Sequence, residues 1–340
     1  MAYCIGLAKL AGKATKSNPM VGSVLVFNGQ IIGEGYHKSF GTNHAERNAI
    51  DNVSIKDKHL IRESTLYVTL EPCSRYSKTP PCIDYILKHE IKKVVIGTLD
   101  PNPREQHRSI DKMREQGIDL VIGILEEECK LLIRSFEANL RKRPYIILKW
   151  AQSKDGYLAK KGERTKLTNH FSDTLVHKWR SNVDGIMIGT NTAIIDNPHL
   201  TVRHWKGENP KRVILDRTGK LSSELHVFNQ KTETIIITEN LPKEAFLEIQ
   251  YLQLNEWNLN DIISQLYLQD IYSIIIEGGR QLLTSFIDIG LWDEARIFTV
   301  DQELQDGLKS PNIEGKLRLK QQFITDNLVV IDNLTSKELK

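Results

Sequence analysis

The sequence predicts an α/β protein made of two successive domains. Short apolar runs alternate with helix-forming stretches along nearly the whole chain, which is the pattern of α/β folds. A length of 340 residues suits two domains. The basic run Arg141-Lys142-Arg143 before Pro144 is typical of a connector, and a fresh apolar strand follows it. We therefore expect domains over residues 1–143 and 144–340.

The first domain is expected to begin with a helix and a β-hairpin. Residues 2–14 have an amphipathic helical pattern. Asn28-Gly29 joins two apolar runs, 22–27 and 30–36, and is the two-residue hairpin signal that needs positive φ at both positions. The remaining elements are expected to be helices over 44–52, 81–89, 108–116 and 126–140, and strands over 66–70, 93–98 and 118–122.

The second domain repeats the alternation of strand and helix. Its strands are expected over 145–149, 185–189, 212–216, 234–238, 273–277 and 295–300, and its helices over 173–181, 259–269 and 280–289. Glu277-Gly278-Gly279 ends a strand and precedes a helix. Glycines at such a turn let a phosphate approach the free N–H groups of the helix N-terminus. The same glycines can equally serve to pack the strand against the helix.

Three metal-ligand residues, His44, Cys73 and Cys82, indicate a catalytic zinc site in the first domain. Catalytic zinc takes three protein ligands, keeps a fourth position for water and lowers the pKa of that water to about 7. Glu46 lies close enough to His44 to reach the water as general acid and base without being a ligand. Cys82 follows two prolines at a helix start, where a thiolate is favoured.

Each part of this pattern also has a simpler explanation. A His-x-Glu sequence occurs by chance, and two cysteines are often buried small hydrophobes. A structural zinc site has four protein ligands, and Cys4 and Cys129 are not spaced to complete one. The occurrence of all these parts together and in one order favours a catalytic zinc site over these simpler explanations.

Composition excludes several classes of protein. No apolar run approaches the roughly 18 residues of a membrane span, and the N-terminal stretch lacks the apolar core of a signal peptide. Four cysteines in so long a chain do not form a disulfide framework. A net charge of +3 is too small to indicate nucleic acid as a partner. We expect a cytoplasmic protein with neither a membrane nor a nucleic acid as partner.

The order of these and further motifs resembles the bifunctional deaminase-reductase of riboflavin biosynthesis over about residues 1–335. The motifs that carry the resemblance are Asn18-Pro19-Met20-Val21-Gly22, Gly33-Glu34-Gly35-Tyr36-His37, Thr69-Leu70-Glu71-Pro72-Cys73, Lys78-Thr79-Pro80-Pro81-Cys82, Lys149 to Gly156, Gly189-Thr190-Asn191-Thr192, Asp196 to Arg203 and Ile276-Glu277-Gly278-Gly279. The resemblance implies a cytidine-deaminase-like domain with a mixed sheet, followed by a dihydrofolate-reductase-like α/β domain.

The resemblance also implies two reactions on small phosphorylated pyrimidines. A zinc-activated hydroxide, with Glu46 as proton shuttle, would deaminate 2,5-diamino-6-(5-phosphoribosylamino)pyrimidin-4(3H)-one. NADPH would then reduce the ribosyl group to ribityl. The implied cofactors are one zinc ion per chain and NADPH, and the implied assembly is a homo-oligomer, a dimer or higher.

Further site residues are carried over from the same motifs. The deaminase substrate would be bound by Asn18, His37, Arg75 and Lys78. NADPH would be bound by Ala151, Thr192, Asp196, Gly279, Arg280 and Ser285. The reductase substrate would be bound by Lys149, Arg180, Leu200, Arg203 and Glu277, in which the arginines suit a phosphate.

Four departures from the family pattern affect particular expectations. Asn43 stands where the family commonly has proline, and Arg75 where it usually has histidine. Residues 104–110 lack the usual glycines, so we expect a differently shaped loop. Residues 165–168 replace a pattern whose aromatic ring packs against the cofactor, which leaves the preference between NADPH and NADH open.

Two other classes of function would also account for part of this pattern. A polynucleotide-editing deaminase should have a basic, aromatic-rich face, which the charge balance and the second domain disfavour. Alternatively, the chain could be a deaminase alone, with a degenerate second domain that binds nucleotide or supports a dimer. Asp196, Arg203 and Glu277 weigh against that alternative.

Overall fold

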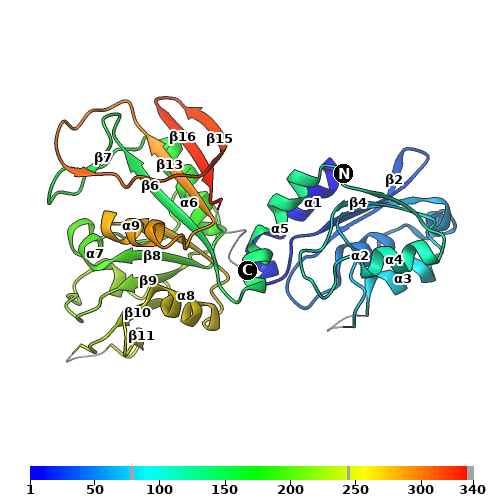
Figure 1. Cartoon of the computed structure of the whole chain (residues 1–340), viewed down its shortest axis with the longest axis horizontal. Coiled ribbons are helices and arrows are strands. Elements are labelled where there is room, and N and C mark those ends of the chain that lie inside the picture. The colour runs from blue at the N-terminus through cyan, green and yellow to red at the C-terminus, as the bar shows by residue number, and fades with distance from the viewer. Residues whose placement is uncertain (77–79, 243–245, 335–340) are drawn as a thin grey trace. The chain divides into compact units, whose positions relative to one another are not determined.

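The structure is a computed structural model that describes residues 1–76, 80–242 and 246–334. The chain folds into two compact units, Met1–Arg141 and Lys142–Lys340 (Figure 1). Each unit has its own sheet and its own hydrophobic core. Among the helices of the described residues, none has the length and apolar character needed to cross a membrane.

The sheet of the first unit has five strands in the order β2-β1-β3-β4-β5. Its strands are β1 (Gly22–Phe27), β2 (Gln30–Tyr36), β3 (Thr65–Leu70), β4 (Lys93–Thr98) and β5 (Asp119–Ile122). Strand β1 pairs antiparallel with β2 and β3, whereas β3, β4 and β5 are parallel, so the sheet is mixed. Asn28 and Gly29 have φ of 46° and 78°, which confirms the predicted hairpin turn.

Helices cover the sheet of the first unit, with α1 and α5 on one face and α2, α3 and α4 on the other (Figure 1). Their bounds are α1 (Ala2–Lys9), α2 (Ala45–Asp51), α3 (Cys82–Lys88), α4 (Arg108–Glu115) and α5 (Glu126–Leu140), with 3-10 turns at Gly12–Thr15 and Ile55–Glu63. The helix predicted over 2–14 is shorter than expected. Gly12, with φ of 52°, turns the chain into a 3-10 turn.

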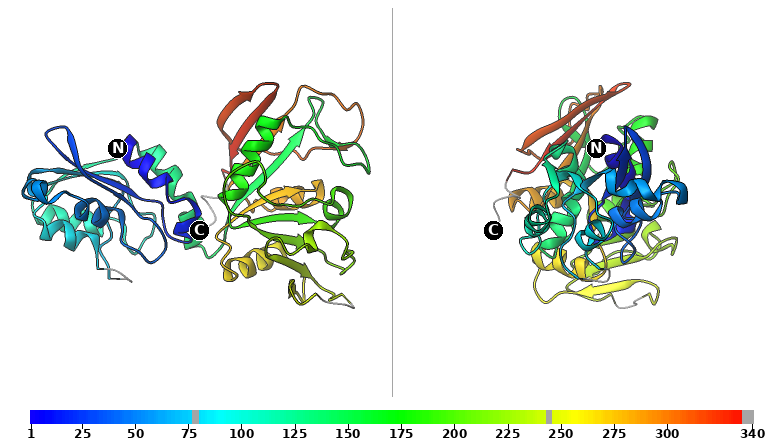
Figure 2. Two further views of the ribbon diagram at one scale, coloured as in Figure 1. Left: turned by 180° about the vertical axis from the view of Figure 1, so that it is seen from behind. Right: turned by 90° about the vertical axis from the view of Figure 1, so that its right-hand side faces the viewer.

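The second unit contains a nine-stranded sheet in the order β11-β10-β9-β8-β12-β6-β13-β16-β15. Its strands are β6 (Tyr145–Gln152), β8 (Gly185–Gly189), β9 (Lys211–Leu215), β10 (Thr234–Thr238), β11 (Gln250–Gln253), β12 (Ser273–Gly278), β13 (Glu294–Thr299), β15 (Lys316–Phe323) and β16 (Asp326–Asp332). In this spatial order, all strands from β11 through β13 are parallel to their neighbours. Strand β16 pairs antiparallel with β13 and with β15, and β15 and β16 form the red hairpin in Figure 2.

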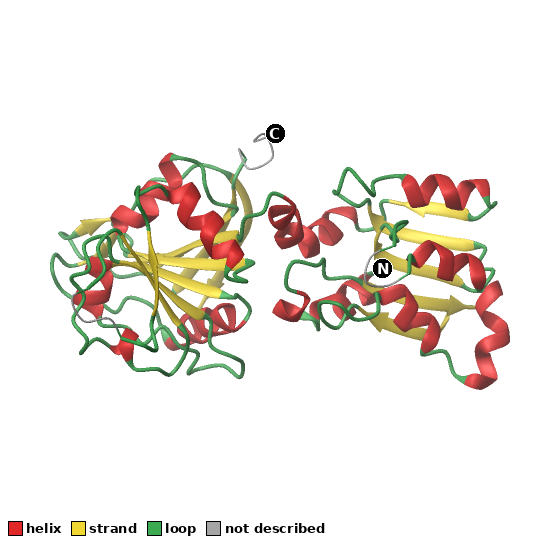
Figure 3. Ribbon diagram, turned by 90° about the horizontal axis from the view of Figure 1, so that it is seen from below, coloured by secondary structure: helices red, strands yellow, loops and turns green. Residues whose placement is uncertain are grey.

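Helices also surround the larger sheet (Figure 3). They are α6 (His170–Ser181), α7 (Thr190–Asp196), α8 (Leu259–Leu268) and α9 (Arg280–Asp288), with a 3-10 turn at His226–Phe228. A separate ribbon pairs β7 (Tyr157–Ala159) with β14 (Leu308–Lys309). Helix α7 follows β8, and α9 follows β12, so both helices begin where parallel strands end. That edge of a parallel sheet is where α/β proteins bind ligands.

Candidate active sites

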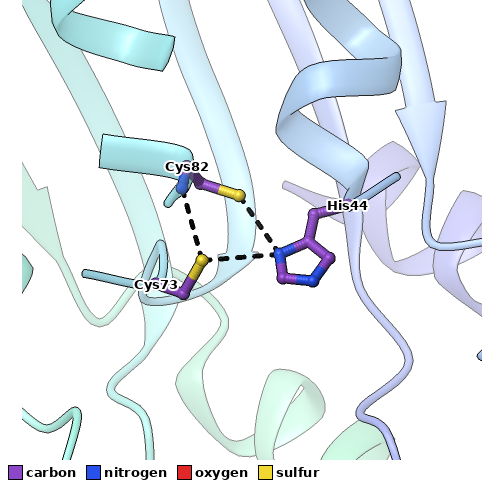
Figure 4. Close-up of side chains that lie close together, drawn as sticks. All are labelled: His44, Cys73 and Cys82. Atoms are coloured by element: carbon purple, nitrogen blue, oxygen red, sulfur yellow. Dashed lines mark hydrogen bonds between the residues drawn. The ribbon is translucent and has the colours of Figure 1, made fainter. Parts of the chain in front are cut away.

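Three chain segments bring His44, Cys73 and Cys82 together in the first unit. His44 is the N-cap of α2, with extended φ and ψ of −72° and 165°. Cys82 is the first residue of α3, directly after the N-cap Pro81, as the two prolines predicted. Cys73 follows the end of β3 by three residues. Two helix starts and one strand end therefore present the three side chains to one point (Figure 4).

The donor atoms of these three side chains are spaced as zinc requires. The Nδ1 atom of His44 lies 3.2 Å from Sγ of Cys82 and 3.5 Å from Sγ of Cys73 (Figure 4). All three donor atoms lie within 4.8 Å of one another. Two sulfurs and one imidazole nitrogen are ligands that zinc prefers. Within the described residues no fourth ligand joins the group, which is the composition of a catalytic site with one open position.

Hydrogen bonding favours one of the two thiols as the thiolate. The Cys82 thiol lowers the pKa of Cys73 to about 5, against the effect of burial, and His44 adds to the lowering. The same hydrogen bond, with burial, raises the pKa of Cys82. The first backbone N–H of α3, that of Cys82, donates to Sγ of Cys73 at 3.3 Å. The N–H group at the start of α3 therefore stabilises negative charge on the Cys73 sulfur.

Glu46 lies in the first turn of α2 beside the three donors, and is not one of them. Its side chain is buried, and burial raises the pKa of its carboxyl group. The carboxyl group also hydrogen-bonds the Cys82 thiol. A buried carboxyl group beside a three-ligand metal site is able to transfer protons to and from a reacting molecule.

Of the four predicted substrate residues, His37 lies next to His44, and Asn18 hydrogen-bonds to His37. Nδ2 of Asn18 donates to Nε2 of His37 over 3.1 Å, and Nδ1 of His37 donates to the carbonyl of Asn43 over 3.2 Å. The rings of His37 and His44 meet edge to face with centroids 5.5 Å apart. Burial lowers the pKa of His37, in keeping with a neutral ring that accepts from Asn18. Asn43 therefore accepts a hydrogen bond from His37 through its backbone carbonyl. This contact does not depend on the side chain, which is where Asn43 departs from the proline of the family pattern.

The other two predicted substrate residues are Arg75 and Lys78. The side chain of Arg75 is 51% exposed, and its Nε lies 3.7 Å from Oε1 of Glu105. Lys78 lies outside the described residues.

Glu71 is a buried residue of this site that the sequence did not reveal as important. Its Oε2 accepts from the backbone N–H groups of Asp100 and His107, both at 3.2 Å, and its Oε1 accepts from Oγ of Ser109 at 2.9 Å. Glu71 thus ties the segment before Cys73 to both ends of the loop that follows β4. Its position in the motif before Cys73 is the signal that could have indicated it.

The second unit contains a cleft of about 1550 Å³ at the strand ends described above. Its lining includes all eleven residues predicted for the reductase site: Lys149, Ala151, Arg180, Thr192, Asp196, Leu200, Arg203, Glu277, Gly279, Arg280 and Ser285. Pockets for one small molecule usually measure about 300–1000 Å³. The cleft therefore has room for a dinucleotide and a second ligand together.

An ion pair lies at the floor of this cleft. Nε and Nη2 of Arg180 donate to Oε1 and Oε2 of Glu277 at 2.8 and 2.7 Å, and Nη1 donates to the carbonyl of Thr201 at 3.3 Å. Burial alone would raise the pKa of Glu277, but Arg180 and Lys149 outweigh it and lower the pKa to about 2. Burial lowers the pKa of Lys149, and Glu277 opposes that effect.

Arg203 is held by its backbone and by its side chain. Its N–H donates to Nδ1 of His177 at 3.0 Å, and its Nη1 donates to Oγ1 of Thr201 at 3.1 Å. Burial is the main cause that lowers the pKa of His177, to about 4, so the ring stays neutral and can accept. Arg203 is exposed, unlike Arg180. Of the two arginines, Arg203 is the one open to a ligand phosphate.

The turn from β12 to α9 fits a nucleotide. Gly278 has φ of 119°, and Gly279 is the N-cap of α9. A Cβ atom at Gly279 would lie only 3.0 Å from Oγ1 of Thr192, so a side chain there would press on α7 and fill the space between the two helix starts. Glycine keeps that space open, and the N–H groups at a helix start bind phosphate. The residues present therefore fit a dinucleotide cofactor.

A zinc-type site of two thiols and one imidazole, joined in one chain to a nucleotide-sized cleft, is the combination of a zinc deaminase and a nucleotide-dependent reductase. Residues 1–98 match the family described as the cytidine and deoxycytidylate deaminase zinc-binding region, and residues 144–301 match the RibD C-terminal domain. The chain belongs to the RibD family of riboflavin biosynthesis proteins. The predicted fold class and the prediction of a bifunctional enzyme with zinc and NADPH are confirmed by this membership.

Relatives of this family match the chain over almost its whole length. The riboflavin biosynthesis protein RibD of Aquifex aeolicus is 39% identical over 337 residues, 95% of this chain and 94% of the relative. That of Actinobacillus pleuropneumoniae is 33% identical and covers 100% of this chain and 90% of the relative.

Solved structures agree with the sequence relatives. A diaminohydroxyphosphoribosylaminopyrimidine deaminase/5-amino-6-(5-phosphoribosylamino)uracil reductase from Thermotoga maritima has a TM-score of 0.89 and 36% identity, and the match covers 98% of this chain and 97% of that one. The RibD of Acinetobacter baumannii has a TM-score of 0.83 and 31% identity, with 97% of each chain covered.

Proposed function

We propose that the chain catalyses two successive steps in two separate sites. The first unit removes ammonia from 2,5-diamino-6-(5-phosphoribosylamino)pyrimidin-4(3H)-one by adding water. The second unit then reduces the ribosyl group of the product to ribityl with NADPH. The observation that carries this proposal is the pairing of a three-ligand site beside buried Glu46 with the large cleft around Glu277. We assign the two functions to residues 1–143 and 144–340.

In the deaminase site, His44, Cys73 and Cys82 hold one zinc ion. Bound zinc supplies a Lewis acid that makes water reactive at neutral pH. Glu46 accepts a proton from the water that attacks the amino-bearing ring carbon and delivers a proton to the departing nitrogen. The new bond is carbon to oxygen, the broken bond is carbon to nitrogen, and ammonia leaves.

Asn18, His37, Arg75 and Lys78 bind the substrate of this step. Asn18 donates its amide N–H to His37, so its Oδ1 is oriented to accept from an N–H group of the pyrimidine. Arg75 is half-exposed and two residues from Cys73, where its planar guanidinium suits the phosphate. Specificity for a phosphorylated pyrimidine follows from the two kinds of contact together.

In the reductase site, Ala151, Thr192, Asp196, Gly279, Arg280 and Ser285 bind NADPH. When bound, NADPH would supply a hydride; the reduction forms a C1′–H bond and breaks the bond from C1′ to the ring oxygen, which takes up a proton from water. Arg203 binds the substrate phosphate, with Leu200 beside it. Arg180 holds the Glu277 carboxylate in place, and Lys149 lies near that carboxylate as a buried cation. These residues fix the orientation on which hydride transfer depends.

We propose further that the chain forms a dimer or higher oligomer. The exposed edge strand β15 offers one surface for assembly, with Leu317 and Leu319 58% and 41% exposed. Light scattering of the purified protein tests this proposal, and a monomer at all concentrations would contradict it.

The two activities are tested together in one assay. Purified chain, zinc, NADPH and the diaminopyrimidine ribosyl phosphate are mixed, and absorbance at 340 nm and ammonia are followed in parallel. We expect ammonia release followed by an equal loss of NADPH. Ammonia without loss of NADPH would contradict the second step, and neither signal would contradict both.

A further inference from the structure

Glu105 lies in the loop that follows β4, and its carboxylate reaches the segment that carries Cys73. Its Oε2 accepts from the backbone N–H of Ser74 at 3.1 Å and from Oγ of Ser74 at 2.9 Å. Its Oε1 lies 3.7 Å from Nε of Arg75, and its side chain is only 14% exposed. One carboxylate therefore binds both residues that follow Cys73.

The loop itself is built to present this carboxylate. Oδ1 of Asp100 accepts from the N–H of Asn102 at 2.8 Å, and Oδ1 of Asn102 accepts from the N–H of Arg104 at 3.1 Å. These are successive Asx turns, which fix a loop without regular structure. His107 then takes left-handed φ of 64° where α4 begins. The loop thus makes its turn without the glycines that the family usually has at this place.

Glu71 and Glu105 bracket Cys73 in the chain. Glu71, two residues before Cys73, holds both ends of the loop by accepting from the N–H groups of Asp100 and His107. Glu105, from within that loop, holds Ser74, the residue after Cys73. Each carboxylate belongs to the segment that the other one binds. The loop after β4 and the Cys73 segment are therefore fixed to each other from both sides.

The contact with Arg75 differs in kind from the contacts with Ser74. The carboxylate accepts charge-assisted hydrogen bonds from Ser74 where little solvent reaches it, whereas the Arg75 side chain is half-exposed. The contact with Arg75 is an ion pair through Nε at 3.7 Å, beyond hydrogen-bond distance, so it biases the position of the guanidinium. Because a guanidinium has five N–H donors, this pairing retains donors for a second anion.

We propose that Glu105 is a positioning residue of the deaminase, which holds Ser74 and orients the Arg75 guanidinium toward the phosphate of the substrate. The inference rests on the proposed function of the first unit. Glu105 acts through Arg75 and does not touch the reacting atoms. Its removal should therefore weaken substrate binding and leave the chemical step nearly unchanged.

The test compares Glu105→Ala and Glu105→Gln with the matched control Glu115→Gln, which removes an exposed carboxylate at the end of α4. Ammonia release is measured against concentration of the diaminopyrimidine ribosyl phosphate, with ribose 5-phosphate as a competing probe. We expect Glu105→Ala to raise KM and the inhibition constant about tenfold, with kcat within about twofold. Glu105→Gln keeps an acceptor for Ser74 but has no charge for Arg75, so we expect KM and the inhibition constant to rise only about threefold. The control should match the wild type.

A double-mutant cycle with Arg75→Ala separates positioning from general support. The cycle uses Glu105→Gln, which keeps an acceptor for Ser74: if the lost charge acts through Arg75, the double variant Glu105→Gln/Arg75→Ala has the KM of Arg75→Ala alone. Additive effects, an unchanged KM in Glu105→Ala, or a loss of kcat with unchanged KM would each overturn the inference. Absence of ammonia in the wild type would instead overturn the proposed function itself, so the two failures are distinguishable.

Discussion

Arg180 and Glu277 form a two-point ion pair in the reductase cleft, between helix α6 and the end of β12. The two N···O distances are 2.8 and 2.7 Å, and the side chains are 12% and 9% exposed. The pair occupies one edge of the Arg180 guanidinium. Arg180 therefore organises the cleft by holding Glu277, and Arg203 remains as the arginine open to a phosphate.

Removal of Arg180 should destabilise the second unit. Arg180→Ala leaves the Glu277 carboxylate buried without its partner, which costs about 3–5 kcal/mol. All five tryptophans lie in the second unit, so urea unfolding followed by tryptophan fluorescence reports that unit alone. The matched control is Arg217→Ala, which removes the ion pair of the 58% exposed Arg217 side chain with Glu239 and should leave the midpoint unchanged. Equal midpoints for both variants would contradict the importance of the buried pair.

The same ion pair should give the second unit a defined sensitivity to acid. The folded pKa of Glu277 is about 2 against an ordinary 4.5, so its stabilising contribution is complete above pH 4.5 and is lost as pH falls from 4.5 to 2. The loss should be about 3 kcal/mol. Tryptophan fluorescence in urea at several pH values measures it, and Glu277→Gln should abolish this part of the pH dependence. Parallel curves for the two proteins over that range would refute the assignment.

Glu46→Gln should stop deamination and leave the metal site intact. The amide cannot accept and return the proton, while His44, Cys73 and Cys82 still supply the ligands. We expect a loss of kcat of at least about a hundredfold, with the zinc content of dialysed protein unchanged. Ammonia assay and metal analysis of the same sample check both expectations. Loss of zinc in this variant would mean that Glu46 is a ligand.

Arg203→Ala should raise the KM of the reduction about tenfold to a hundredfold, because a charge-assisted contact with phosphate is lost. Oxidation of NADPH with the deaminated ribosylaminouracil phosphate as substrate measures the effect. Deamination by the same variant serves as the internal control and should be unchanged. An unaltered KM for reduction would remove Arg203 from the substrate site.

Much of the fold follows from local sequence signals. The bounds of β1, β2, β4, β8, β10 and α5 agree with those predicted, because apolar runs, turn residues and a long amphipathic period mark each of them. Helix α7 was not predicted, since its first residues, Thr190 to Thr192, are polar. Strands β15 and β16 were also missed. The β15 strand is exposed along nearly its whole length, although its alternating Lys-Leu-Arg-Leu-Lys pattern was a strand signal.

In the sites too, residues marked by local motifs could be predicted, whereas contacts between residues far apart in the sequence could not. The zinc ligands could be predicted because motif spacing and ligand chemistry indicate them, and the structure brings their donor atoms together. The Arg180–Glu277 pair joins residues 97 positions apart, and the contact of Glu105 with Ser74 spans 31. Such contacts depend on how strands and loops are arranged in space. No local pattern in the sequence could reveal them.

The most direct test of two reactions in two sites uses the Glu46→Gln chain with each substrate in turn. Ammonia and absorbance at 340 nm are recorded with the diaminopyrimidine ribosyl phosphate and then with the deaminated ribosylaminouracil phosphate. We predict neither ammonia nor NADPH oxidation with the first substrate, and NADPH oxidation at the wild-type rate with the second. NADPH oxidation with the first substrate, or none with the second, would contradict the order of the steps or the independence of the two sites.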